Sequence, residues 1–463
     1  MNVSIIGAGY VGLVTGVCLA EKKHHVTCVD IDKEKVKKIS DGVSPIFENG
    51  LEDLLKKNIS NKNFTATTNL KKAVRASEIS IVAVDVPLVN NKVEFKYLRN
   101  AVKDIGIALK KLNGYHVIVV KSTVPPGTTD DVVLPILEEY SDKKSGVDFG
   151  VSANPEFLRE GCAVSDFLKP DRIVIGGIDK KTTEKIVELY KPFDGDVLVT
   201  NNKTAEMIKY VSNALLATLI SFSNEIANIC AMTENVDVKE VMAGVHLDRR
   251  LNPRIPGGGR VNPEILSYLE AGCGFGGSCL PKDIETLINY CVGADSSCKC
   301  GLLKSVAEVN REQPKKLLQL LRKHNGSLEN SIVAVLGLAF KPNTDDVRGS
   351  PAIPVIRSLR RKRACIKAYD PLAQKNARKI LGTIGILYPE SLEETLIDVD
   401  AVILITPWEE FRELHILINK LESPPLIIDG RRMLDKSKYK RYVGIGLNDA
   451  NVCMKNGEPY GCC

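Results

Sequence analysis

The feature that most constrains the fold is a run of spaced glycines near the N-terminus, Gly7-Ala8-Gly9-Tyr10-Val11-Gly12. A short apolar run at residues 3–7 leads into it, a helical stretch at 13–21 follows it, and the apolar run HVTCVD then ends at Asp30. In such a strand–turn–helix–strand unit the first glycine permits a tight turn, the second lets a ligand approach the backbone, and the third allows close packing of helix on strand. The N-terminus therefore predicts a dinucleotide-binding βαβ unit.

The position of Asp30 indicates which dinucleotide this unit binds. Asp30 follows Gly9 by 21 residues, at the end of the second strand, where a carboxylate accepts hydrogen bonds from both ribose hydroxyls. The helix N-terminus after the glycine turn attracts the pyrophosphate, whereas the Asp30 carboxylate would repel a 2′-phosphate. We therefore expect NAD rather than NADP; the alternative is a structural glycine turn that binds no ligand.

Strand-like and helical patterns alternate in both outer thirds of the chain. Apolar runs at 79–87, 115–123, 149–157 and 172–177 alternate with helical stretches, which is typical of a parallel, doubly wound sheet. From Thr204 onward the pattern is helical for about a hundred residues. Strand patterns return at 331–340, 364–371, 400–408, 425–432 and 442–446. The predicted fold is α/β, with a Rossmann domain at 1–200, a helical middle domain at 201–325 and a second Rossmann-like domain at 326–463.

Length and composition exclude several classes of protein. The 463 residues exceed one ordinary core, and 44% hydrophobic with 26% charged residues is typical of globular chains. No apolar run approaches 18 residues, so we predict no membrane span, and the N-terminus lacks the basic leader of a signal peptide; a cytoplasmic location follows. The net charge of +6 includes the basic run 357–363, which we expect on a helix face rather than in a nucleic-acid site.

The 13 cysteines are odd in number and scattered, so we expect mostly reduced thiols. Cys291, Cys298 and Cys300 lack the paired C-x2-C spacing of a zinc site, and no metal is predicted. We expect Cys462 and Cys463 to lie in a frayed tail, with lipidation as the alternative.

Past the middle of the chain, the segment GCGFGGSCLPKD at 272–283 places Cys279 among glycines. These glycines are expected to leave the backbone bare so that a substrate can approach, and Lys282 adds positive charge that favours the thiolate. A thiol in a dinucleotide-dependent enzyme suggests covalent capture of an aldehyde as a thiohemiacetal, which can then yield a second hydride and become a thioester.

Seven segments resemble the signature segments of the UDP-glucose/GDP-mannose dehydrogenase family, occur in the family's order and span almost the whole chain. They are GAGYVG (7–12), KSTVPPGTT (121–129), NPEFLREG (154–161), AEMIKYVSNALLA (205–217), GFGGSCLPKD (274–283), GLAFKPNTDDVRGSP (337–351) and DGRR (429–432). The resemblance implies an NAD-dependent, four-electron oxidation of the C6 alcohol of a nucleotide sugar to a uronic acid.

The resemblance also implies roles for individual residues. Cys279 matches the catalytic thiol, Lys209 the lysine that stabilises negative charge on the C6 oxygen, and Glu156 the base that opens the thioester. Asn213 would bind substrate or position water, and Asp283 and Thr123 would hold the water used for proton transfer. The structural alternatives are a solvated helix residue for Lys209, an N-cap for Glu156 and a helix-to-helix hydrogen bond for Asn213.

Ligand-binding residues follow from the same resemblance. The coenzyme set is Gly7, Gly9, Tyr10, Val11, Gly12, Asp30, Lys35, Thr123, Glu160, Lys282 and Arg348. The substrate set is Phe157, Leu158, Arg159, Glu160, Lys209, Asn213, Arg250, Tyr268, Leu269, Glu270, Ala271, Gly272, Gly276 and Lys341, of which 268–272 match the loop that closes over substrate. For Lys341 and Arg348 the alternative is a surface position without a ligand.

The resemblance implies UDP-glucose as the substrate, because members of the family that act on acetamido sugars tend to differ from NPEFLREG; GDP-mannose and a UDP-N-acetylhexosamine are the alternatives within the family. Outside the family, a two-electron Rossmann dehydrogenase shares the fold but stops at one hydride, and a binding module that holds NAD structurally needs no reactive thiol. The long helix from Thr204 suggests a homodimer or higher homo-oligomer, in which Arg250 reaches a neighbouring subunit's site.

Overall fold

The computed structural model describes residues 1–295, 297–448, 454–455 and 458–459, and the chain divides into two compact units, Met1–Ser212 and Asn213–Cys463. The division falls inside the long helix α9 (Asn202–Cys230). The predicted tail cysteines, Cys462 and Cys463, lie outside the described residues.

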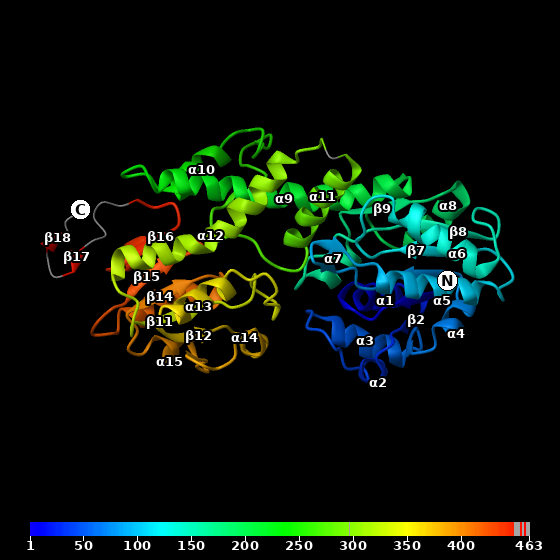
Figure 1. Cartoon of the computed structure of the whole chain (residues 1–463), viewed down its shortest axis with the longest axis horizontal. Coiled ribbons are helices and arrows are strands. Elements are labelled where there is room, and N and C mark those ends of the chain that lie inside the picture. The colour runs from blue at the N-terminus through cyan, green and yellow to red at the C-terminus, as the bar shows by residue number, and fades with distance from the viewer. Residues whose placement is uncertain (296, 449–453, 456–457, 460–463) are drawn as a thin grey trace. The chain divides into compact units, whose positions relative to one another are not determined.

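The first unit is built on a six-stranded parallel sheet with the order β3-β2-β1-β4-β7-β8 (Figure 1). The direction of strand succession reverses between β1 and β4, and in open α/β sheets ligands bind at the carboxyl ends of the strands at such a point. The glycine turn follows β1 directly. The strands are β1 (Asn2–Ile6), β2 (His25–Val29), β3 (Phe64–Thr67), β4 (Ile79–Val82), β7 (His116–Val120) and β8 (Phe149–Ala153).

Helices pack on both faces of this sheet. Successive side chains of a strand point to opposite faces, so both sets are buried in the central strands. In β7, Val117 and Val119 join the core formed with α1, whereas Ile118 and Val120 join the core formed with α5. The strands therefore consist almost entirely of apolar residues, as expected for a parallel sheet covered by two helical layers. The helices are α1 (Tyr10–Glu21), α2 (Lys33–Ser40), α3 (Leu51–Ser60), α4 (Leu70–Arg75), α5 (Lys96–Leu109), α6 (Leu134–Ser141), α7 (Ala163–Leu168) and α8 (Lys180–Tyr190).

One predicted strand does not join the main sheet. The run at 172–177 forms β9 (Arg172–Gly176), which pairs in parallel with β10 (Asp196–Thr200) in a separate two-stranded sheet. The sequence analysis did not predict β10, although its residues DVLVT are strand-like, nor β3, nor the hairpin of β5 (Leu88–Val89) and β6 (Lys92–Val93). An apolar run indicates that a strand is buried but does not indicate its neighbour, so the expectation of one continuous sheet was wrong in this respect.

The second unit contains another six-stranded parallel sheet, in the order β13-β12-β11-β14-β15-β16. Its core also includes side chains from the helical segment, such as Ala227 of α9, Met242 of α10 and Leu317 of α12. The strands are β11 (Ile332–Leu336), β12 (Cys365–Tyr369), β13 (Ile386–Leu387), β14 (Ala401–Leu404), β15 (Leu426–Asp429) and β16 (Tyr442–Gly444), with a short hairpin of β17 (Met454–Lys455) and β18 (Glu458–Pro459).

The helices of the second unit form a continuous helical stretch before the sheet and then alternate with its strands. A second, smaller core joins α9, α11 and α12 through Ala217, Ile284 and Val306. The helices are α10 (Val238–His246), α11 (Leu280–Ala294), α12 (Gly301–Asn325), α13 (Ala352–Arg361), α14 (Gln374–Leu381), α15 (Leu392–Leu396) and α16 (Leu414–Ile418).

The predicted fold class is confirmed: α/β, with two doubly wound parallel sheets and a helical segment between them in sequence. The proposed domain boundaries near residues 200 and 325 stay a prediction. Within the described part of the chain, no helix is both long enough and apolar enough to cross a membrane.

Candidate functional site

The glycine turn between β1 and α1 has one position open to a ligand. Gly7 has φ +106°, and a Cβ there would lie 2.6 Å from the Ala83 carbonyl oxygen; at Gly12 it would lie 1.9 Å from the Gly7 carbonyl oxygen. At Gly9 a Cβ would meet no atom within 4 Å. The first and third glycines are thus required by backbone packing, and the second leaves open space at the N-terminus of α1, as a pyrophosphate requires.

Asp30 lies beside this turn and is held as an anion. Its carboxylate accepts hydrogen bonds from the backbone N–H groups of Ala8 (2.9 Å) and Asp32 (3.0 Å), and pairs with Lys35 at 3.1 Å. Burial raises the pKa of Asp30, but the hydrogen bonds from Asp32, Ala8 and Lys35 outweigh burial and leave the pKa below its usual value. A fixed negative charge at this position fits a ribose with two free hydroxyls. Lys35, expected to contact the coenzyme, pairs with Asp30.

Tyr10 and Val11 occupy the first turn of α1, and Tyr10 has a structural contact that the sequence did not reveal. Its hydroxyl donates to buried Glu48, and the Glu48 carboxylate also accepts from the N–H groups of Gly161 (2.7 Å) and Ala163 (2.9 Å). Glu48 therefore ties the coenzyme turn to the loop at 154–162. A glutamate between α2 and α3 carries no sequence signal for this role.

A buried ion pair joins two of the predicted catalytic residues. The Lys209 Nζ lies 3.1 Å from the Glu156 Oε1, and their side chains are 5% and 6% exposed. Lys209 is therefore not the solvated helix residue of the alternative interpretation. The other Glu156 oxygen accepts from the Leu158 backbone N–H at 2.6 Å, so this side chain also holds the local loop.

A second lysine, which sequence reasoning did not select, lies in the same buried region. Lys121 is 3% exposed, and its Nζ donates to the Asn154 side chain at 3.0 Å and to the Tyr190 hydroxyl at 3.2 Å. Burial lowers its pKa, the Glu156 charge opposes the decrease and the Lys209 charge adds to it, with the result that the pKa is about 8. One carboxylate therefore pairs with one of two buried ammonium groups and interacts with the other through its charge, an arrangement that favours an additional negative charge nearby.

Thr123 follows the carboxyl end of β7, and the chain beyond it is anchored by Glu206. This buried carboxylate accepts from the N–H groups of Gly127 (2.6 Å) and Thr129 (2.8 Å) and from the Thr129 hydroxyl (2.6 Å). Burial raises the pKa of Glu206 to about 7, against the opposing effect of these hydrogen bonds. Because Glu206 lies three residues before Lys209 on α9, it fixes the helix to the loop that carries Thr123.

The predicted substrate segment Phe157–Glu160 is half-buried except for Arg159, which is exposed. The Phe157 ring lies between cations, with the Arg172 guanidinium 4.0 Å and the Lys209 ammonium 5.5 Å from its centroid. Arg159 pairs with Asp166 at 2.8 Å. The structure therefore places Phe157 beside Lys209 and Glu156, whereas the exposed Arg159 pairs with the partly buried carboxylate of Asp166.

In the second unit, Cys279 is exposed and directly precedes α11. The helix begins with the hydrogen bond from the Asp283 N–H to the Cys279 carbonyl at 2.8 Å, and Lys282 lies in its first turn. The unsatisfied N–H groups at a helix N-terminus and a nearby ammonium both stabilise a thiolate. The local structure therefore provides the environment that a nucleophilic cysteine needs.

Asp283 and Asn213 form a buried pair one helical turn from Cys279. The Asn213 Nδ2 donates to the Asp283 Oδ2 at 2.6 Å, which is the helix-to-helix hydrogen bond of the structural alternative. The other oxygen, Oδ1, is 3.3 Å from the Lys282 Nζ and accepts no hydrogen bond from the described chain. A buried carboxylate oxygen with spare acceptor capacity can bind a water or a substrate hydroxyl.

The glycines around Cys279 have a different purpose from the one expected. A Cβ at Gly276 would lie 2.4 Å from the Gly349 carbonyl oxygen, and one at Gly277 would lie 2.9 Å from the Phe340 ring. The Gly277 N–H also donates to the Arg348 carbonyl at 2.9 Å. The prediction that these glycines leave bare backbone for a substrate was wrong at 276 and 277, because the segment packs there against the loop 340–349.

The predicted substrate loop 268–272 is anchored at its end. The Gly272 N–H donates to Asn224 of α9 at 2.8 Å, and its carbonyl accepts from Gln313 of α12 at 2.9 Å. Leu269, Ala271 and Gly272 are buried, Tyr268 is half-buried and Glu270 is exposed.

Of the remaining predicted ligand contacts, Arg250 and Arg348 lie at the surface and Lys341 does not. Arg348 pairs with Asp346 at 2.7 Å, and Arg250 pairs with Asp248 with its own side chain 88% exposed. Lys341 is half-buried, and its ammonium lies 5.6 Å from the Phe340 ring centroid.

The chain matches all three domains of one family along most of its length. These are the UDP-glucose/GDP-mannose dehydrogenase family's NAD binding domain (residues 1–194), central domain (203–312) and UDP binding domain (334–436).

Full-length relatives and solved structures agree with these matches. The chain is 42% identical to the UDP-glucose 6-dehydrogenase TuaD of Bacillus subtilis over 99% of this chain and 95% of that protein, and 38% identical to the UDP-glucose 6-dehydrogenase of Rickettsia prowazekii over 96% and 99%. Its structure resembles the UDP-glucose dehydrogenase of Pyrobaculum islandicum with a TM-score of 0.86 and 36% identity, over 96% of this chain and 97% of that one. The resemblance stated from the sequence is confirmed, and the chain belongs to the UDP-glucose/GDP-mannose dehydrogenase family.

Proposed function

We propose that this protein oxidises the C6 hydroxymethyl group of UDP-glucose to the carboxylate of UDP-glucuronate. Membership of the family makes it an NAD-dependent nucleotide-sugar dehydrogenase. UDP-glucose is favoured over GDP-mannose and UDP-N-acetylhexosamines because curated relatives at 36–42% identity are UDP-glucose 6-dehydrogenases.

NAD accepts a hydride in each oxidation, and the residues at the glycine turn would hold it. Gly9 offers open space for the pyrophosphate, the N-terminus of α1 attracts its charge, and Asp30 would accept the ribose hydroxyls. Within the described residues, the spacing at Gly7–Gly12 lies between a strand and a helix, whereas GCGFGG at 272–277 has the same spacing but follows the 3-10 helix 264–269, and VLGLAF at 335–340 lacks the spacing. The same coenzyme site would therefore serve both oxidations.

In the first oxidation the alcohol loses a proton and a hydride to become an aldehyde. Lys209 would stabilise the negative charge that develops on the C6 oxygen, since the buried cluster with Lys121 and Glu156 carries more ammonium than carboxylate groups. Glu156 would hold the Lys209 ammonium in position and, in the last step, act as a base toward water.

In the second oxidation Cys279 would add to the aldehyde carbon. The Cys279 thiolate forms a C–S bond, the carbonyl oxygen takes a proton to give a thiohemiacetal, and loss of that proton and a hydride gives a thioester. Water then adds to the thioester carbon, the C–S bond breaks, and the thiolate and the carboxylate are released. Asp283 would bind a water through its spare oxygen, and Asn213 would hold Asp283 in place. For Thr123 the family resemblance implies a role in holding water.

The observation that carries this proposal is the position of Cys279 at the N-terminus of α11, next to Lys282 and the buried Asn213–Asp283 pair. We expect the purified protein, given NAD and a panel of UDP- and GDP-sugars, to release two NADH per uronic acid with UDP-glucose. Cys279→Ala should lower uronate formation by several orders of magnitude, about as much as loss of a covalent nucleophile costs elsewhere.

Two results would argue for an ordinary two-electron dehydrogenase instead. One is a stoichiometry of one NADH per sugar. The other is free aldehyde captured in quantity by a hydrazine trap with the unmodified protein. Near-normal uronate turnover by Cys279→Ala would exclude the thioester route.

We further propose that the protein acts in the cytoplasm as a homodimer or higher homo-oligomer. Helix α9 supports this, because Leu215, Phe222 and Ile229 are each about half exposed at seven-residue spacing, which puts three large apolar side chains on one face. Sedimentation of the wild type against Phe222→Glu tests the interface. A wild type that sediments as a monomer would contradict it.

A further inference from the structure

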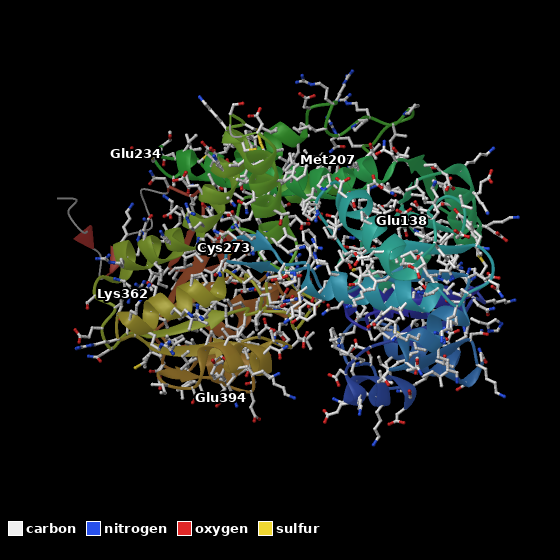
Figure 2. All side chains as sticks on the ribbon, turned by 45° about the vertical axis from the view of Figure 1, so that its right-hand side comes forward. Glu138, Met207, Glu234, Cys273, Lys362 and Glu394 are labelled. Carbon is white, nitrogen blue, oxygen red and sulfur yellow. A yellow bond between two sulfur atoms is a disulfide. The ribbon has the colours of Figure 1, made fainter. Side chains whose placement is uncertain are left out.

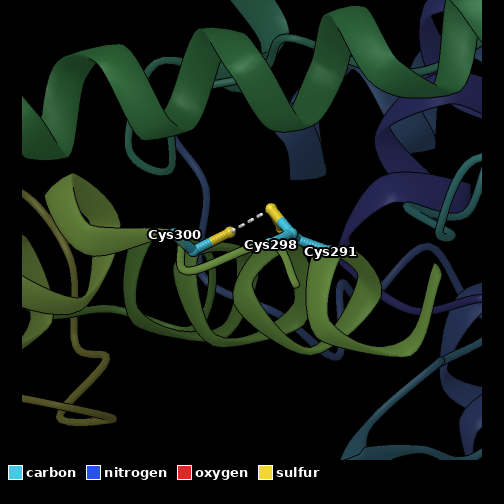
Figure 3. Close-up of side chains that lie close together, drawn as sticks. All are labelled: Cys291, Cys298 and Cys300. Carbon is cyan, nitrogen blue, oxygen red and sulfur yellow. Dashed lines mark hydrogen bonds between the residues drawn. A yellow bond between two sulfur atoms is a disulfide. The ribbon is translucent and has the colours of Figure 1, made fainter. Parts of the chain in front are cut away.

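A cluster of three cysteines lies where α11 gives way to α12, outside the machinery described above. Cys291 and Cys298 form a disulfide with Cα atoms 6.1 Å apart, and the Cys300 Sγ lies 3.7 Å from the Cys298 Sγ (Figure 3). All three sulfur atoms lie within 4.8 Å of one another, and all three residues are partly exposed. The disulfide makes Cys291 and Cys298 exceptions to the expectation that most of the thiols are reduced.

This cluster is separate from the catalytic thiol. Cys291 follows Cys279 by 12 residues along α11, which corresponds to roughly 18 Å of helix. Cys273, which is labelled in Figure 2, also differs from the cluster. Its side chain is fully buried, and burial raises the pKa of its thiol.

We propose that Cys291, Cys298 and Cys300 form a binding site for one soft divalent metal ion of the zinc class, and that the disulfide closes this site. Thiolates bind Zn²⁺ at about 2.3 Å, which places sulfur atoms of a tetrahedral site about 3.8 Å apart. The 3.7 Å between Cys298 and Cys300 already matches this spacing. Three protein ligands leave the fourth position open to water, as the partial exposure of the cluster allows.

The backbone of the loop holds each cysteine in place. The Cys291 carbonyl accepts from the Asp295 N–H at 3.0 Å, the Cys298 N–H donates to the Asp295 carbonyl at 3.0 Å, and the Cys300 carbonyl accepts from the Lys304 N–H at 3.1 Å. Cys300 also caps the N-terminus of α12 with φ 44°, and a helix N-terminus favours the thiolate form that ligates metal. The fold therefore already restricts the three cysteines, which reduces the conformational entropy that metal binding would lose.

The chemistry of opening the site is a two-electron reduction. A dithiol reductant delivers two electrons and two protons to the Cys291–Cys298 disulfide and becomes a disulfide itself, leaving three protein thiols. Binding of one divalent ion to the three sulfurs then releases three protons. In the reverse direction an oxidised disulfide compound takes up two electrons and two protons and becomes two thiols, while the Cys291–Cys298 disulfide re-forms, which removes two ligands and expels the ion.

The test uses the full-length protein carrying Cys279→Ala, so that the catalytic thiol does not bind the probe. The protein is reduced with a phosphine, desalted without oxygen and titrated with Cd²⁺, whose thiolate complexes absorb in the ultraviolet; Zn²⁺ is then added in competition. We expect one Cd²⁺ per chain, displaced by Zn²⁺, and no uptake by the oxidised protein.

Matched variants identify the ligands. Cys300→Ser should weaken Cd²⁺ binding by more than roughly tenfold. Loss of a residue that only supports a metal ligand already lowers metal affinity by about that factor, and Cys300 would be a ligand itself. Cys365→Ser, which removes an exposed thiol elsewhere in the same unit, should change nothing. Reduced protein that takes up no stoichiometric Cd²⁺, or uptake that Cys300→Ser leaves intact, overturns the proposal, whatever the outcome of the activity assays.

Discussion

Substituting either member of the buried Lys209–Glu156 pair should strongly destabilise the first unit. The loss of stability should differ between the lysine and the glutamate substitution. Both side chains are about 5% exposed, and the ammonium and carboxylate are 3.1 Å apart. Removing one partner of a buried ion pair typically costs about 3–5 kcal/mol, because the other charge loses its compensation in a region that water does not reach.

The position of Lys121 predicts the direction of the inequality. Lys209→Met leaves Glu156 with the positive charge of Lys121 nearby, so its cost should fall near the lower end, about 3 kcal/mol. Glu156→Gln leaves two buried ammonium groups that repel each other without the carboxylate that compensates them, so its cost should fall near the upper end, about 5 kcal/mol. The double variant should lose less free energy of unfolding than the two single variants lose together, by at least about 2 kcal/mol.

The pH dependence gives an independent check. The pKa of Lys121 is already lowered to about 8, and loss of the Glu156 charge, which opposes that decrease, should lower it further. Above pH 8 the Lys121 amine is then neutral in the folded protein. The destabilisation by Glu156→Gln should therefore shrink as the pH rises toward 8, because the variant's Lys121 loses its proton first, and should stay constant above pH 8, where Lys121 is neutral in both folded proteins.

The assay is urea unfolding at equilibrium, followed by far-ultraviolet circular dichroism and by tryptophan fluorescence. The chain has one tryptophan, Trp408, which lies in the second unit, so its signal serves as an internal control for a substitution in the first. Hydrogen exchange in β7 and β8 reports the first unit directly. If the double variant loses as much stability as both single variants combined, the two side chains are not coupled and the reasoning fails.

Three further outcomes are expected. Asp30→Ala should raise the Km for NAD at least about tenfold and reduce the preference for NAD over NADP, because the anion that accepts the ribose hydroxyls is lost. An unchanged coenzyme preference would show that Asp30 does not contact the coenzyme. For Glu206, burial raises the folded pKa from 4.5 to about 7, so the native state binds the extra proton and wild-type stability falls as pH rises from 4.5 through 7, by about 3 kcal/mol. Glu206→Gln should abolish this slope in unfolding measured from pH 4 to 8, and a variant with the wild-type slope would show that another group titrates. Gly277→Ala should cost about 1–3 kcal/mol in unfolding followed by Trp408, since φ is +83° and the new Cβ would lie 2.9 Å from Phe340; Gly293→Ala, in open space on α11, is the control.

The sequence by itself determined those features that depend on residues close together in the chain. The glycine spacing at 7–12 permits a tight turn between strand and helix. A Cβ at Gly12 would clash with the Gly7 carbonyl oxygen in this turn. Runs of apolar residues specified strands buried on both faces, and Cys279 stands directly before a helix whose first turn carries Lys282 and Asp283. Each of these follows from backbone geometry over a few residues, so a linear pattern carries it.

The identity of each partner was decided only by tertiary structure. Glu156 pairs with Lys209 across 53 residues, Asn213 with Asp283 across 70, and Glu206 with the loop before η1 (Thr129–Val133) across 77. The local pattern around Glu156 is the same whether it caps a loop, pairs with a lysine or faces solvent. The structure shows that it does the first two.

The same reason explains the two expectations that failed. The residues at β9 form a strand as predicted, but its neighbour is β10 rather than the main sheet, since a strand's own residues do not specify the edge it joins. Gly276 and Gly277 are glycines because the 340–349 loop packs against their backbone, and that loop is more than 60 residues away in the chain. Sequence periodicity reports how a residue is oriented on its own element; which atoms occupy the space it faces depends on the packing of the whole unit.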